Sequence, residues 1–231
     1  MVLKMRKVVY LILILLLVSC ADFGRKRLSC EELALLRAQV GKEFSLESFR
    51  LWVHETYRVP LESIWIATTK DGQVHIVHWG DPNRTYYYAA LEAMAGQLVV
   101  DDITFGGVRG SADGIIACLG EPGLYSARYN FDPPAYANAL HVVLLFPEQG
   151  VLASGAKFFD SRPKQPPPIR GDFPVDFIRF FRPGTAEQIL DRLFGGSPAL
   201  YEQALQEHKP WPGKWEDIMV EIDPNIYWNI P

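Results

Sequence analysis

Two early segments of the chain carry apolar side chains at every third or fourth position, which is the spacing of amphipathic helices. Ser29, followed three residues later by Glu32, predicts a capping box at the start of the first helix, and Gly41 predicts its end. Ser45 predicts the start of a second helix, which ends before Pro60. The apolar faces of these helices are expected to consist of Leu33, Leu36, Val40, Phe49, Trp52, Val53 and Tyr57.

The pattern then changes to segments rich in β-branched and aromatic residues, which favour strands. Turn residues such as Asp71-Gly72 separate them, as in antiparallel hairpins. After four such segments, Ser111 predicts the start of a short helix that ends at Gly120, and further strands follow it. The predicted strands are residues 64–68, 74–79, 85–91, 97–105, 124–129, 140–146, 151–159 and 175–181.

Two further segments stand out towards the end of the chain. The proline-rich residues 162–174 cannot enter a sheet and are expected to form an exposed loop. Thr185 with Gln188 predicts a second capping box, and the helix that follows is expected to end at Gly195.

Helical segments precede strands twice along the chain, and this order predicts an α+β fold with helices packed on antiparallel meander sheets. The body is expected to span residues 29–231, and it could consist of two tandem α-then-meander units. Their halves would be residues 29–105 and 111–196, followed by an aromatic tail at 197–231. The tail is expected to pack on its own domain, with an exposed platform for sugars or a partner as the alternative. Its tryptophans are Trp211, Trp215 and Trp228.

The first nineteen residues have the parts of an export signal. Lys4, Arg6 and Lys7 supply a positive start, and residues 8–18 form an unbroken apolar run. Because a membrane-spanning helix needs roughly 20 apolar residues, this run is too short to span a bilayer. Residues 1–19 are therefore predicted to be a signal peptide that is removed, with an uncleaved anchor or a signal cut elsewhere as alternatives.

The motif Leu17-Val18-Ser19-Cys20 is similar to the lipobox of bacterial lipoproteins. The resemblance implies cleavage before Cys20 and acyl chains, such as palmitate, attached through the Cys20 sulfur. Two or three chains on one residue would hold a protein stably at a membrane. The implied location is extracytoplasmic, anchored to the cell membrane or the outer membrane, with residues 20–28 as a short tether.

Composition supports a folded, exported body. With 48% hydrophobic and 13% aromatic residues, the chain can bury a substantial core, which argues against disorder. The formal charge of −4 includes the three cations of the signal peptide, so the mature chain would carry −4 − 3 = −7. This sign, together with export, disfavours a nucleic-acid partner.

Cysteine, glycine and acidic residues are the candidates for chemistry. Once Cys20 is lipidated, Cys30 and Cys118 are the thiols that remain, and an oxidising compartment could pair them, although a buried free thiol at Cys118 is the alternative. Where a strand is expected to lead into a helix, glycines and a basic residue could bind an anion through backbone amides, although glycines at such a corner usually only turn the chain. This candidate corner consists of Gly107, Arg109, Gly110 and Ser111.

No metal, cofactor or catalytic pair is predicted. His75 and His78 lie three residues apart in a strand, so their side chains are expected on opposite faces. Asp101 and Asp102 are likewise expected on opposite sides of their strand, which leaves no paired carboxylates.

The segment S-A-D-G-I-I-A-C-L-G-E-P, residues 111–122, resembles the helix signature of small outer-membrane assembly lipoproteins, the SmpA/BamE family, and of β-lactamase-inhibitor-like modules. Ile115, Leu119, Gly120 and Pro122 match it, and the resemblance covers residues 110–159. It implies a lipoprotein module that binds other proteins without catalysis. The whole chain is also similar to other bacterial lipoproteins of unassigned activity.

The sequence therefore predicts a membrane-anchored, non-catalytic lipoprotein that binds an envelope protein or assists envelope assembly. The alternative is an envelope hydrolase whose residues converge only in space. A substrate-binding lipoprotein of a transporter fits less well, because its lobes would contain parallel sheets.

Overall fold

The computed structural model describes residues 29–81, 85–132, 137–159 and 167–222. The predicted signal peptide, Cys20, the tether and Trp228 lie outside these ranges. Within them, no helix is long and apolar enough to cross a membrane.

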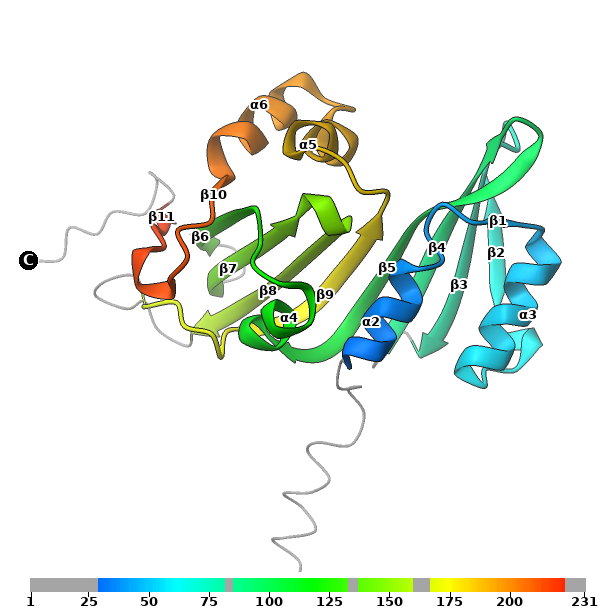
Figure 1. The fold of residues 1–231 in the computed structure, drawn as a ribbon, viewed down its shortest axis with the longest axis horizontal. Helices are drawn as coiled ribbons and strands as arrows, with labels where there is room; N and C mark the ends of the chain where they lie inside the picture. Colours follow the sequence, from blue (N-terminus) through cyan, green and yellow to red (C-terminus); the bar gives the residue numbers. More distant parts are fainter. Residues whose placement is uncertain (1–28, 82–84, 133–136, 160–166, 223–231) are drawn as a thin grey trace, which may run out of the picture.

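One sheet forms the centre of the molecule, and its strands run in the order β10-β6-β7-β8-β9-β5-β4-β3-β2 (Figure 1). Neighbours from β2 to β9 pair antiparallel, while the short β1 joins β5 and the short β11 joins β6. The α+β fold with an antiparallel meander sheet is therefore confirmed. The strands are β1 (Glu43–Phe44), β2 (Trp65–Thr68), β3 (Val74–Asp81), β4 (Thr85–Met94), β5 (Gln97–Ser111), β6 (Leu124–Asp132), β7 (Ala137–Phe146), β8 (Val151–Phe159), β9 (Pro174–Phe181), β10 (Lys209–Pro210) and β11 (Glu221–Ile222).

Two four-stranded meanders, β2–β5 and β6–β9, make up most of this sheet. The last strand of each meander pairs with the other, so that Asp102 lies opposite Phe181 and Gly106 lies opposite Phe177. The chain passes from the first meander to the second at Ser111, where β5 ends and helix α4 (Ala112–Leu119) begins. The two meanders are therefore joined edge to edge through β5 and β9.

Helices α2 (Cys30–Arg37), α3 (Leu46–Tyr57) and α4 contribute to the main core. Phe49 and Val53 of α3 are fully buried against strand residues such as Trp79, and Ile115 of α4 belongs to the same core. As predicted, Ser45 caps α3, although Ser48 completes its capping box. This core occupies one face of the sheet along both meanders.

Helices α5 (Ala186–Phe194) and α6 (Pro198–Glu207), orange in Figure 1, belong to a second, smaller core. Strand residues Leu145, Leu152 and Phe181 contribute to it, and their chain neighbours contribute to the main core. Because neighbouring strand residues point to opposite faces, α5 and α6 cover the other face of the second meander. The predicted capping box of Thr185 and Gln188 opens α5.

Two local predictions were wrong, one for the start of α2 and one for the proline-rich loop. Ser29 caps α2, but the Glu32 side chain does not complete a capping box, because it is buried and accepts a hydrogen bond of 3.0 Å from the Tyr87 hydroxyl. The proline-rich loop at 162–174 was predicted to be exposed. In its described part, residues 167–174, Ile169 and Phe173 are buried in the main core. In both cases a tertiary contact outweighs the local signal.

The tail folds back on the body, as expected for its described part. Trp211 and Trp215 pack against the main core, and the Trp215 ring nitrogen donates a hydrogen bond of 2.8 Å to Asp113. Strand β10 extends the sheet beside β6, and the amide of Met219 donates to the Tyr125 hydroxyl. These contacts leave the two tryptophans unsuited to an open platform.

Acid is expected to destabilise this fold through His208, which follows α6. Burial lowers the pKa of His208 from 6.5, although Glu207 and Glu221 oppose the shift. Because the pKa is lower in the folded state, the unfolded chain binds a proton more readily. The contribution of His208 to folding stability is therefore complete above pH 6.5, its ordinary pKa, and is lost as the pH falls through the lowered pKa of the folded state. Urea unfolding between pH 7 and pH 5 should therefore show less loss of stability in His208→Gln than in the wild type. Equal pH dependence of the two proteins would contradict this role.

Candidate functional site

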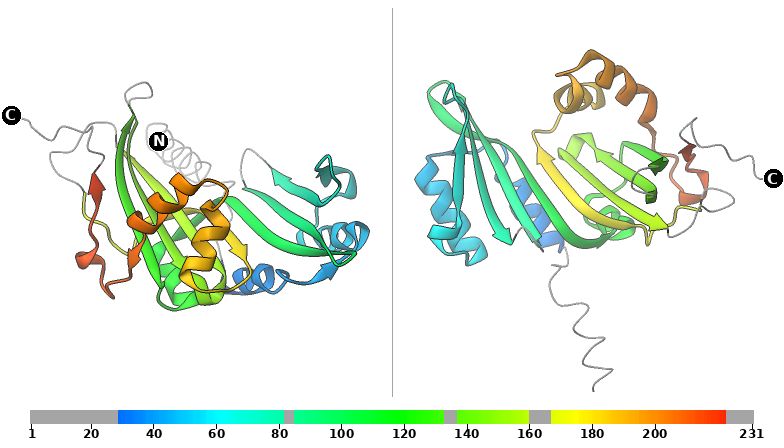
Figure 2. Two further views of the ribbon diagram at one scale, coloured as in Figure 1. Left: turned by 90° about the horizontal axis from the view of Figure 1, so that it is seen from above. Right: turned by 180° about the vertical axis from the view of Figure 1, so that it is seen from behind.

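A row of five side chains crosses the first meander and reaches β9 of the second, on the face opposite to α3. Consecutive strands place them as direct neighbours, in the order Trp65, His78, Tyr88, Thr104 and Arg179. The chain neighbours of these residues, such as Val77 and Phe105, belong to the main core on the other face. No helix in the described residues covers this part of the sheet, and α2 and α3 lie on its far side (Figure 2, right). We call this surface the open face.

Aromatic rings form the outer half of the row. The ring centroids of Trp65 and His78 lie 4.2 Å apart, and those of His78 and Tyr88 lie 5.6 Å apart. Trp65 is 59% exposed. Tyr86 extends this aromatic surface, because its ring lies over Gly106, where an added Cβ would come within 2.3 Å of the Tyr86 Cζ atom. His78 and Tyr88 are half-buried, so the exposed part of this aromatic surface consists mainly of Trp65 and Tyr86.

Charged residues form the inner end of the row, where the open face meets α5. Asp102, only 6% exposed, pairs with Arg179 at 2.7 Å, and Asp101 pairs with Arg182 at 3.1 Å and with Arg192 of α5. The two aspartates therefore lie on the same face, contrary to the expectation from simple alternation. The reason is a bulge, since Ala90 lies opposite Asp102 but Leu91 lies opposite Val100, which leaves Asp101 as an extra residue.

This cluster contains polar groups that the fold leaves without partners. Among the described residues, the buried atoms Thr104 Oγ1, Asp102 Oδ1 and Arg179 Nε make no hydrogen bond. Burial raises the pKa of Asp102, and the nearby Arg179 guanidinium only partly opposes this shift. An unsatisfied buried polar group costs about 1–3 kcal/mol, so this cluster lowers the stability of the fold at the inner end of the row.

Comparisons with protein-family models, with curated proteins and with solved structures find no match to this chain. Within the chain itself, one histidine contacts a hydroxyl, since Thr68 Oγ1 lies 2.9 Å from His75 Nδ1. Thr68 is exposed and His75 is half-buried, and no hydrogen bond joins this histidine to a carboxylate in the described structure. The part of the chain that the structure describes also holds no cluster of three metal-binding side chains.

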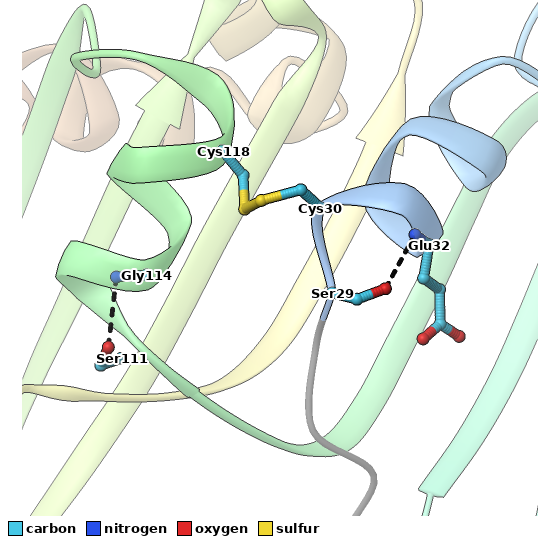
Figure 3. The surroundings of a disulfide bond; sticks show 6 residues. All are labelled: Ser29, Cys30, Glu32, Ser111, Gly114 and Cys118. Atoms are coloured by element: carbon cyan, nitrogen blue, oxygen red, sulfur yellow. Dashed lines mark hydrogen bonds between the residues drawn. A yellow bond between two sulfur atoms is a disulfide. The ribbon is translucent and has the colours of Figure 1, made fainter.

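The predicted cysteine candidates lie together, away from the open face. Cys30 of α2 and Cys118 of α4 form a disulfide, with their Cα atoms 5.2 Å apart (Figure 3). The bond joins the first described helix to the helix that precedes the second meander. It is consistent with folding in an oxidising compartment.

The predicted anion-binding corner is not supported by its hydrogen bonds. Strand β5 continues through it to Ser111, with a positive φ of 72° at Gly107 and a register shift between Gly106 and Gly110. The first amides of α4 are already used by protein acceptors. They donate at 2.9 Å from Ala112 to the Phe173 carbonyl, at 2.8 Å from Asp113 to the Gly171 carbonyl and at 3.2 Å from Gly114 to Ser111 Oγ.

The corner instead forms part of the wall of a cavity of about 870 Å³. Arg109, Gly110 and Ser111 line it together with apolar residues of both meanders and of two helices. The sequence therefore pointed to residues that line a cavity, but the anion-binding role that it suggested for them is not supported. The aromatic row was missed, because its members are far apart in the chain and strand pairing alone brings them together.

Proposed function

We propose that this chain is an exported lipoprotein, held at a membrane through Cys20, that binds a partner protein of the cell envelope on its open face. The observation that carries this proposal is the uncovered row of Trp65, His78, Tyr88 and Arg179. Tryptophan, tyrosine and arginine are the residues that most often dominate binding energy at protein interfaces. The lipobox and the helix signature support export and a binding role, and no observation specifically favours the hydrolase alternative.

The lipid anchor predicts a labelled protein in cells. Cells given radioactive palmitate should incorporate the label into the wild-type chain and not into Cys20→Ser, because the thioether requires the Cys20 sulfur. Detection after denaturing electrophoresis excludes lipid that is only adsorbed. A labelled Cys20→Ser variant would contradict the anchor.

The open face predicts a specific crosslink. A photoreactive amino acid in place of Ala67, an exposed residue of β2 two positions from Trp65, should yield one discrete product with an envelope protein. Adding Trp65→Ser should abolish that product while changing stability by no more than about 0.5 kcal/mol, because this side chain is mostly exposed. The matched control places the photoreactive group at Leu51, which is exposed on α3. Equal products from both positions would contradict the proposal.

A further inference from the structure

The described chain begins beside the place where the central strands β5, β8 and β9 start or end. We call this end of the strands the edge. Ser29 caps α2, and the disulfide between Cys30 and Cys118 holds this start beside α4 (Figure 3). The end of β5, the start of β9 and the end of β8 lie at the same edge, along the bottom of Figure 1. The point at which any anchor joins the body is therefore fixed by a covalent bond.

The distance from this edge to an anchor at Cys20 is short. Eight residues separate Cys20 from Ser29. Nine Cα-to-Cα steps of about 3.5 Å allow a separation of at most about 32 Å. With a lipid on Cys20, the edge cannot move far from the headgroups.

Phe158 lies at this edge and is the most exposed large apolar side chain in the described residues, at 68%. It lines the cavity of about 870 Å³ together with Leu33, Ile115 and Cys118. Strand β8 pairs with β9 only as far as Ser154, so the end of β8 continues past its neighbour. An exposed phenyl ring beside an apolar hollow costs free energy in water and is stabilised at a lipid interface.

Charge does not explain the exposure of this edge. Basic and acidic side chains are balanced there, so no net positive patch would attract anionic lipid. The basic residues are Arg109, Lys157 and Arg170, and the acidic residues are Asp113, Asp172 and Asp176. Within the described residues, attraction of this edge to a bilayer must therefore come from apolar contact, whereas Arg25, Lys26 and Arg27 of the tether supply positive charge.

We propose that Phe158 and the rim of its cavity form a lipid-contacting edge that rests in the interface of the membrane to which Cys20 is anchored. This inference rests on the proposed anchor. The other end of β5, beside Met94, lies away from the lipid, since fifteen residues of strand extend up to about 46 Å at roughly 3.3 Å per residue. The anchored chain then stands with its β4–β5 turn directed into the envelope.

The test uses residues 20–231 with Cys20→Gly, joined enzymatically at the N-terminus to a dipalmitoyl lipid in neutral phosphatidylcholine vesicles. An environment-sensitive fluorophore is attached at Phe158→Cys or, as the matched control, at Met94→Cys, with the native disulfide closed. Nitroxide lipids in the vesicle should quench the fluorophore at position 158 several-fold more than the one at position 94. Unquenched fluorescence at position 158, or equal quenching at both, would overturn the proposal.

Salt separates apolar contact from charge. In 1 M NaCl the Debye length is about 3 Å, and quenching at position 158 should persist. Quenching at position 158 that is absent from neutral vesicles, appears only when anionic lipid is added and disappears in salt would overturn apolar contact as the basis of the proposal. Because the lipid is attached in vitro, a failure here concerns the edge alone, whereas loss of palmitate labelling in cells would concern the anchor alone.

Discussion

Reduction of the disulfide between Cys30 and Cys118 is expected to lower the free energy of unfolding by about 4–5 kcal/mol. The bond closes a loop of 88 residues, and the chain-entropy model gives this magnitude for such a loop at 25 °C. The bond also joins α2, at the start of the described chain, to α4, and so adds a covalent link to the packing of Leu33 and Leu36 in the main core. Urea unfolding monitored by tryptophan fluorescence, with and without reductant, measures the difference.

The control for this experiment is the double variant Cys30→Ser/Cys118→Ser. It should unfold at the same urea concentration with and without reductant, close to that of the reduced wild type. A wild type whose unfolding does not respond to reductant, although the thiols become reactive, would show that the bond contributes nothing to stability.

Replacing Arg179 by methionine is expected to lower stability by about 3 kcal/mol, because it leaves the buried Asp102 carboxylate without its cation. Burial raises the pKa of Asp102 in the folded protein. A raised pKa means that protonation favours the folded state, so the deficit should be largest at neutral pH and should shrink as the pH falls through that raised value. Urea unfolding at neutral and mildly acidic pH tests both statements.

The matched control removes both charges. Asp102→Leu/Arg179→Met should recover most of the lost stability, since apolar pairs often replace buried ion pairs without a net cost. If the double variant were as unstable as Arg179→Met alone, the deficit would reflect lost packing rather than an unpaired charge.

Local signals in the sequence predicted the elements of the fold well. The caps at Ser29, Ser45, Ser111 and Thr185 are all present, and the eight predicted strands correspond to β2–β9, although β5 continues past residue 105 to Ser111. Caps and alternation are encoded within a few residues, so they can be seen in one sequence. Glu32 shows the limit, because its partner Tyr87 is 55 positions away and changes its role.

The candidate site depends on pairing that no local pattern encodes. The antiparallel contact of β5 with β9 places Arg179 next to Thr104, and a bulge turns Asp101 to the same face as Asp102. Simple alternation along one strand predicts neither. The open face is also exposed because α5 and α6 pack on the second meander instead of the first. No local sequence pattern predicts which meander they cover.

The central claim is that the open face binds a partner protein. Its most direct test is the affinity of the crosslinked partner, once purified, for the wild type, Trp65→Ser and Leu51→Ser, measured by titration calorimetry. Loss of a hot-spot side chain costs about 2 kcal/mol, which corresponds to roughly 30-fold weaker binding. We predict this loss for Trp65→Ser and unchanged affinity for Leu51→Ser, whereas equal affinity of all three proteins would contradict the assignment of the open face.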